Sequence, residues 1–133
     1  MSKECYCIPL RTASRKVSAY YNRALEPVGV NIAQFSMLRK IRSAYMITIT
    51  ELSKVCELDR STVGRNVKVL EKMEAVQLIP GDDQRETTVK LTDHGHQILK
   101  DGDDLWEQAQ VDIEEKLGGK DNVDNLLELL KRF

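Results

Sequence analysis

The sequence predicts a mainly helical fold with one small β-hairpin after its midpoint. Apolar residues recur every three or four positions over most of the chain, which is typical of amphipathic helices. Only three prolines and seven glycines occur in 133 residues, so helix breakers are few. Residues 76–91 are the exception, because two short apolar runs there flank Pro80-Gly81-Asp82-Asp83, a sequence typical of a turn.

The first half of the chain is predicted to form four helices. The first spans residues 10–25 and ends before Pro27 and Gly29. Asn31 is expected to cap a second helix that runs to about residue 42. Its inward side chains would be Phe35, Leu38 and Ile41.

A short helix and a longer one are expected next, joined by a tight turn at residues 57–58. Thr50 is the expected cap of the short helix, residues 51–56, and Asp59 is the expected cap of the longer helix, which runs to about residue 73.

The second half begins with a change of period. Residues 76–79 and 87–91 are predicted to be the two strands, with Val89 and Leu91 on one face. Thr92 is then expected to cap a long helix that Gly118 and Gly119 end. Asp121 is expected to cap a final helix.

A short helix, a tight turn and a second helix form a helix-turn-helix, and the hairpin that follows makes it winged. The fold class is therefore mainly α with a small β-hairpin wing, in a single domain over residues 1–133. Residues 31–92 would form the winged helix-turn-helix. Residues 8–26 and 93–133 would form a dimerisation region, because their helices are too apolar for one subunit to bury.

The helix that begins after Asp59 has two different faces. At 100° per residue, Val63, Val67 and Leu70 fall on one side and are expected to face the core. The opposite side contains no carboxylate near its centre and carries Ser61, Gly64, Arg65, Lys68 and Lys72. Cations and a hydroxyl on one helix face suit base edges and phosphates, and a glycine lets a helix sit deep in the major groove. At the hairpin tip, Gln84 and Arg85 suit the minor groove.

The net charge of −1 does not oppose this interpretation, because the charge is unevenly distributed. Residues 91–133 carry eleven acidic and five basic side chains, while residues 1–90 carry an excess of five basic ones. DNA affinity depends on such local clusters rather than on the sum.

Other classes of protein find less support. The chain has neither a signal peptide nor an apolar run of membrane-spanning length, so a cytoplasmic protein without membrane contact is expected. We expect no enzyme, because no phosphate-binding glycine loop or catalytic constellation is present. No cofactor and no metal site are expected, since His94 and His96 point in different directions on a helix and no Cys-x-x-Cys pair exists.

Taken together, these stretches resemble the MarR family of transcriptional regulators over nearly the full chain. The resemblance rests on LDRSTVGR at 58–65 running to LEK at 70–72, on DQR at 83–85 leading to VKLTDHG at 89–95, and on LEPVGV at 25–30 followed by Gln34 and Phe35. It implies that the helix after Asp59, including Thr62, reads the major groove and that Arg85 enters the minor groove, with Asp83 supporting the wing. It also implies that the terminal helices build a homodimer. Two departures are Glu74, where the family usually has glycine, and a wing with less arginine.

The segment CIPLRTASR at 7–15 resembles the organic-hydroperoxide repressor branch of the family. That resemblance makes Cys7 a candidate peroxide sensor, Tyr21 its supporting residue from the other subunit, and Cys5 a candidate resolving thiol. Two further tyrosine positions of that branch are occupied here by Arg11 and Ile32. The alternative interpretation makes Cys5 and Cys7 ordinary residues of a loosely ordered terminus. Cys56 is expected to be a core residue.

The predicted function is a dimeric transcriptional repressor that binds a palindromic double-stranded operator. It would be released either by oxidation of Cys7 or by a small apolar or aromatic effector between the dimer helices and the DNA-binding part. A protein-interaction module that keeps the fold but has lost DNA binding is the alternative.

Overall fold

The computed structural model describes residues 3–82 and 86–133. It contains six α-helices, one 3-10 helix and three strands within those residues. In chain order they are α1 (Cys7–Ala24), η1 (Glu26–Val28), α2 (Ile32–Ala44), β1 (Met46–Thr48), α3 (Ile49–Cys56), α4 (Arg60–Lys72), β2 (Val76–Pro80), β3 (Thr87–Leu91), α5 (Asp93–Leu117) and α6 (Lys120–Leu130).

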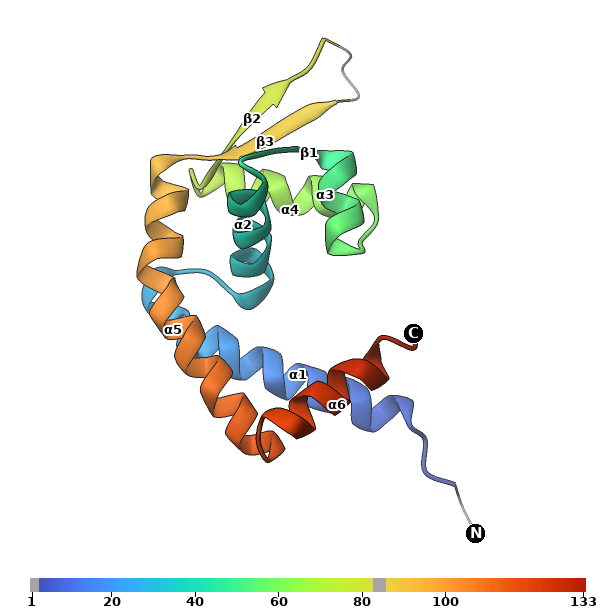
Figure 1. The fold of residues 1–133 in the computed structure, drawn as a ribbon. Helices are drawn as coiled ribbons and strands as arrows, with labels where there is room; N and C mark the ends of the chain where they lie inside the picture. The colour runs from blue at the N-terminus through green and yellow to red at the C-terminus, as the bar shows by residue number, and fades with distance from the viewer. Residues whose placement is uncertain (1–2, 83–85) are drawn as a thin grey trace.

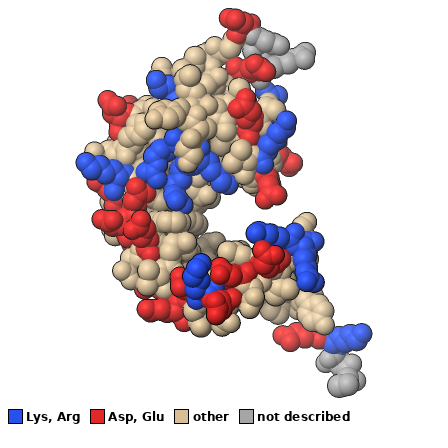
Figure 2. Space-filling view, viewed as in Figure 1, with Lys and Arg blue, Asp and Glu red and all other residues tan. Residues whose placement is uncertain are grey.

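The elements form two parts joined by the long helix α5. Helices α2, α3 and α4 and the sheet form one part, and α1 and α6 lie at the far end of α5 (Figure 1). The surface between the two parts is deeply hollowed (Figure 2). Among the described residues, no helix is both long enough and apolar enough to cross a lipid bilayer.

The sheet has three antiparallel strands in the order β1-β3-β2 rather than the two strands expected. Strand β1 was missed because three residues are too few to show an alternating pattern. Pairing holds it in place, with Ile47 opposite Val89 on the central strand. On the other side Leu78 lies opposite the same Val89. The side chain of Val89 is fully buried, so the sheet rests on the helices through its central strand.

The core lies where the sequence pattern placed it. Phe35, Leu38 and Ile41 of α2 are fully buried, as expected. The same is true of the predicted inner face of α4, namely Val63, Val67 and Leu70. Val89 and Leu91 also face inward from β3.

Two predicted helix starts are confirmed by their caps. Asn31 accepts a hydrogen bond from the backbone N–H of Gln34, and the Gln34 side chain accepts one from the Asn31 N–H, which completes a capping box. Thr92 Oγ1 accepts a hydrogen bond from the Gly95 N–H at 3.0 Å at the start of α5. Gly118, at φ 93°, ends α5 as predicted.

Three predicted starts were wrong. Helix α1 begins at Cys7 rather than at residue 10, because a proline in the first turn, here Pro9, forfeits no helical hydrogen bond. Helix α3 is capped by Thr48 and not by Thr50, since Thr48 has the extended backbone and its Oγ1 accepts from the Glu51 N–H at 3.1 Å. Helix α6 begins at Lys120, which leaves Asp121 inside its first turn.

Side chains of α1 are hydrogen-bonded to α5. The Tyr20 hydroxyl donates to a carboxylate oxygen of Asp112, and the Tyr21 hydroxyl donates to the side-chain carbonyl of Gln110. The first of these hydrogen bonds lowers the pKa of Asp112 and raises the pKa of Tyr20. These contacts tie the first helix to the long helix within one subunit.

The terminal helices leave their apolar side chains uncovered. No residue of α1 or α6 is buried in the single chain. The exposed apolar residues of α1 include Ile8, Leu10 and Val17, and those at the C-terminal end include Leu127, Leu129, Leu130 and Phe133. The exposed apolar stripes expected from the sequence are therefore present, and such stripes are typical of an interface.

Candidate nucleic-acid interface

Helices α3 and α4 are joined by a three-residue turn that depends on a left-handed residue. Glu57 has φ 54° and ψ 44°, in the left-handed region. The N–H of Leu58 donates to the carbonyl of Ser53 at 3.0 Å, which closes the end of α3. Asp59 then precedes α4 in extended conformation, but its side chain accepts no cap hydrogen bond. The predicted helix-turn-helix is thus present, and Asp59 marks the helix start by its backbone rather than by its carboxylate.

The outer face of α4 has the predicted composition. Ser61, Arg65, Lys68 and Lys72 are exposed, while Thr62 is half-buried. Arg65 Nη2 donates to Thr62 Oγ1 at 3.3 Å, so the two side chains lie together on that face. A Cβ added at Gly64 would meet nothing within 4 Å. The centre of the outer face is therefore shallow, and another surface can approach the helix backbone there.

Arg60 is a candidate contact that the sequence analysis did not include. It is exposed and is the first residue of α4, one helical turn before Gly64. Residues four apart lie on the same side of a helix, so Arg60 extends the basic face toward its N-terminal end. The 100° rotation did not single it out, because it puts Arg60 at the edge of the outer face, next to core-facing Val67.

The wing is built by β2 and β3, and its described part closes near the tip. The N–H of Gly81 donates to the carbonyl of Glu86 at 2.9 Å. Asp83, Gln84 and Arg85, the predicted tip residues, lie outside the described residues. Lys90, exposed on the central strand, adds a cation to the described part of the wing.

The end of α4 sets the direction of the wing. Glu74 has φ 61°, so the backbone is left-handed at the position where the family usually has glycine. The Ala75 N–H donates to the Leu70 carbonyl at 3.0 Å, and the Glu74 N–H donates to the Glu71 carbonyl at 2.9 Å. These two hydrogen bonds form a Schellman motif, in which glycine is the usual left-handed residue. A glutamate there raises the backbone energy by about 1 kcal/mol relative to glycine.

Charges of opposite sign occupy different parts of the surface. Figure 2 shows Lys and Arg side chains gathered over α2 above the hollow, while Asp and Glu side chains lie along the outer edge over α5. Helix α4 itself has four basic residues and one acidic residue, Glu71. The charge separation expected from the sequence therefore survives folding, with the acidic surface on the long helix.

Among the predicted redox residues, Tyr21 lies far from the two cysteines in one subunit. Cys5 and Cys7 are both exposed, and Cys7 is the first residue of α1. Cys7 therefore lies at the start of a helix and not in a loosely ordered terminus, while the role of its thiol stays a prediction. Tyr21 lies fourteen residues further along the same helix, which is about 21 Å at the rise of an α-helix. Burial raises the pKa of the Tyr21 hydroxyl. A contact between Cys7 and Tyr21 would therefore have to join two subunits.

The side chains that most often bind metal ions do not cluster among the described residues. His94 and His96 are exposed on the first turn of α5. The described residues contain no group of three or more His, Cys, Asp or Glu side chains that could hold a metal ion. Cys56 is half-buried against the core, as expected.

Comparison with known proteins gives consistent matches. A family model described as the MarR family matches residues 30–87. The multiple antibiotic resistance protein MarR of Escherichia coli (strain K12) is 30% identical over 131 residues, which cover 92% of this chain and 86% of that protein. An uncharacterized HTH-type transcriptional regulator of Bacillus subtilis (strain 168), YwoH, is 32% identical over 83 residues. That match covers 62% of this chain and 61% of the B. subtilis protein.

Solved structures agree with this fold along almost the whole chain. The M. tuberculosis transcriptional regulator MosR, in complex with DNA, has a TM-score of 0.85 and 30% identity. The similarity covers 97% of this chain and 95% of MosR. A mutant of E. coli MarR complexed with operator DNA has a TM-score of 0.83 and 30% identity, covering 92% of this chain and 89% of that one.

Proposed function

This chain belongs to the MarR family, and from that premise we propose that it is a sequence-specific DNA-binding transcriptional repressor. The observation that carries the proposal is the outer face of α4, where exposed cations flank an open glycine. The similar MosR and MarR structures were solved with DNA, so the alternative of a module without DNA binding is not favoured. No catalytic role is proposed, and a DNA target implies action in the cytoplasm.

We assign the DNA contacts to the exposed face of α4 and to the predicted wing tip. Arg65 and Ser61 lie where a helix in the major groove presents its side chains to base edges, with Thr62 beside them. Lys68 and Lys72 lie further along the exposed face and suit phosphates. At the wing tip, Gln84 and Arg85 would enter the minor groove, with Asp83 supporting the turn.

The functional unit is a homodimer. We assign residues 31–92 to DNA binding and residues 8–26 and 93–133 to dimerisation, because the uncovered apolar side chains lie on α1 and α6. A two-fold axis repeats α4 and matches a palindromic operator whose half-sites are about 34 Å apart, one turn of DNA. Each subunit thus reads one half-site.

The direct test is a gel shift with the DNA upstream of the protein's own coding region, at fixed salt. We expect Arg65→Ala to weaken operator binding by about 1–3 kcal/mol, the range for a base-contacting arginine. The matched control is Lys100→Ala, which removes an exposed cation from α5. Equal affinity of Arg65→Ala and Lys100→Ala would refute the assignment of Arg65. Failure of the wild-type protein to bind specific DNA at any salt concentration tested would refute the function.

Two mechanisms could release the operator, and each must favour the spacing of the α4 helices that does not fit DNA. One is a small effector held between the dimer helices and the DNA-binding part. The other is oxidation of Cys7, whose thiol is exposed at the start of α1. We favour the effector, because Arg11 and Ile32 occupy two of the tyrosine positions of the hydroperoxide-sensing branch.

An organic hydroperoxide separates the two mechanisms. We expect wild-type protein and Cys7→Ser to keep the operator equally well after treatment. Release of the operator by wild type but not by Cys7→Ser would establish the oxidation mechanism instead. The thiol content measured before and after treatment confirms that the reagent reached the protein.

A further inference from the structure

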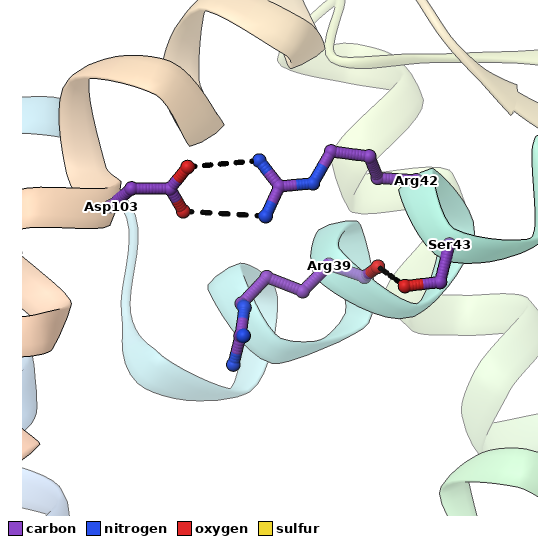
Figure 3. Close-up of polar contacts among 4 residues, drawn as sticks. All are labelled: Arg39, Arg42, Ser43 and Asp103. Atoms are coloured by element: carbon purple, nitrogen blue, oxygen red, sulfur yellow. Dashed lines mark hydrogen bonds and ion pairs between the residues drawn. The ribbon is translucent and has the colours of Figure 1, made fainter.

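Two cations of α2 are held by side chains of the long helix α5. Asp103 accepts hydrogen bonds of 3.0 and 3.3 Å from the two terminal nitrogens of the Arg42 guanidinium (Figure 3). The guanidinium carbon of Arg39 lies 3.8 Å from the centre of the Trp106 ring. Figure 3 shows that Arg39 and Arg42 extend in different directions from α2, so the carboxylate and the ring hold α2 at separate points.

A third contact brings the two helices close together. Gly102 is buried, and a Cβ added there would lie 2.5 Å from Cε2 of Phe35, whose side chain is fully buried. Phe35 and Arg42 are seven residues apart, which is about two turns and about 10 Å along α2. Contacts spread over that length fix the direction of α2 on α5 as well as its position. We call the residues of these three contacts the α2–α5 joint: Phe35, Arg39, Arg42, Gly102, Asp103 and Trp106.

The joint connects the helix assigned to the major groove with the helices assigned to dimerisation. Helices α2 and α4 share one core, in which Leu38 and Val67 are both fully buried, so they move together. On the other side, Tyr20 of α1 donates a hydrogen bond to Asp112, which follows Trp106 on α5 by less than two turns. The angle at the joint therefore determines where each subunit holds α4 relative to the terminal helices.

The ion pair of the joint suits positioning better than stabilisation. The side chains of Arg42 and Asp103 are 35% and 36% exposed. Ion pairs with that much solvent contact contribute little to the free energy of unfolding. Two parallel hydrogen bonds nevertheless fix the orientation of both side chains. Removing the carboxylate should therefore leave a folded subunit with a looser joint.

In a dimer, any change of angle at the joint occurs twice and alters the separation of the two α4 helices. One added base pair lengthens the distance between half-sites by about 3.4 Å and rotates one against the other by about 35°. A stiff joint opposes such a change in both subunits. We propose that the α2–α5 joint determines which half-site spacing the operator must have, with Arg42 and Asp103 as positioning residues that do not touch DNA. Because this role concerns the choice of DNA by the dimer, it rests on the proposed function.

Fluorescence anisotropy with labelled duplexes tests the proposal at fixed salt. The duplexes carry two half-sites at the native spacing, two half-sites with one base pair added at the centre, or a single half-site. We expect wild type to bind the native spacing about 100-fold more tightly than the lengthened one, because only the native spacing engages both subunits fully. For Asp103→Ala that ratio should fall to about tenfold or less, since a looser joint samples more spacings. Its affinity for the single half-site should stay within about twofold of wild type, because α4 is unchanged.

Two further variants separate positioning from general damage, and circular dichroism verifies that each is folded. Asp104→Ala removes an exposed carboxylate from the next position of α5 and should keep the wild-type ratio. The double substitution Arg42→Asp and Asp103→Arg restores the ion pair in reverse and should recover most of that ratio. An unchanged ratio in folded Asp103→Ala, an equal fall in Asp104→Ala, or no recovery in the reversed pair would overturn the proposal.

The separation of the α4 helices can also be measured in the free dimer. Nitroxides attached at Lys68→Cys, in a protein that carries Cys5→Ser, Cys7→Ser and Cys56→Ala, report the distance between the two α4 helices by pulsed electron paramagnetic resonance. We expect one narrow distance distribution, which broadens when Asp103→Ala is added. Equal widths would overturn the role of the joint.

The two measurements separate this inference from the proposed function. Specific operator binding with equal spacing ratios in wild type and Asp103→Ala would overturn the joint and leave the repressor intact. A distance distribution that broadens in Asp103→Ala, in a protein that binds no specific DNA, would support the joint as the element that sets the α4 separation and refute the repressor.

Discussion

Gly95 lies at the junction between the DNA-binding part and the long helix, and the substitution Gly95→Ala tests how tightly that junction is packed. The Gly95 N–H donates to Thr92 Oγ1, and Thr92 Oγ1 donates in turn to the carbonyl of Glu74 at 2.6 Å. The Thr92 N–H donates to the carbonyl of Ala75 at 3.1 Å. The end of α4 and the start of α5 therefore share one hydrogen-bonded network.

A methyl group has no room at this position. A Cβ at Gly95 would lie 2.0 Å from the carbonyl oxygen of Ala75 and 3.1 Å from its carbonyl carbon. Real contacts of this kind stay beyond 3.0 Å, so the two backbones must separate by about 1 Å. Overpacking of this kind destabilises by about 1–3 kcal/mol, and strain on the hydrogen bond between Thr92 and Ala75 adds about 1 kcal/mol. The better helix propensity of alanine offsets less than about 1 kcal/mol of this. We expect a net loss of about 3 kcal/mol.

Urea unfolding followed by circular dichroism measures this loss, with all variants compared at one protomer concentration because a dimer's stability depends on it. Gly64→Ala is the matched control, since it also adds one methyl to a helix but meets nothing within 4 Å. We expect Gly64→Ala to gain up to about 1 kcal/mol from helix propensity. A Gly95→Ala protein within about 0.5 kcal/mol of wild type, the range of an ordinary surface substitution, would refute the packing argument.

Three further outcomes are expected. Gly64→Ala, although more stable, should bind its operator about tenfold more weakly, because the methyl keeps α4 away from the groove; unchanged affinity in a gel shift would contradict a close approach. Tyr20→Phe should raise the pKa of Asp112 toward its ordinary value of 3.8. In the wild type, the lowered pKa of Asp112 stabilises the folded state at pH values above the ordinary pKa, and this stabilisation is lost as the pH falls through the folded pKa. Urea unfolding should therefore show that Tyr20→Phe loses less stability between pH 6 and pH 3 than wild type does. Light scattering should find a dimer at micromolar concentration, and the double substitution Leu127→Asp and Leu130→Asp should give a monomer; a monomeric wild-type protein would refute the interface assigned to the terminal helices.

The features of the fold that depend on nearby residues were predicted from the sequence. The inner face of α4, the cap at Asn31 and the cap at Thr92 were all predicted and are present. Helical periodicity and capping depend on residues within a few positions of each other, so a short stretch of sequence is enough to predict them. The basic outer face of α4 was predicted for the same reason, since helix geometry alone decides which side chains share a side.

Only the tertiary structure decided the features that join distant parts of the chain. Strand β1 exists because Ile47 pairs with Val89, forty-two positions later, and three residues cannot show that by themselves. Likewise, α5 supplies a carboxylate to Arg42 and an aromatic ring to Arg39, whereas neither Arg39 nor Lys40 has an ion-pair partner among the described residues. Whether a lysine or arginine is neutralised depends on which distant side chain folds against it. A sequence pattern records the charge, while the packing of one helix on another determines where that charge remains unpaired.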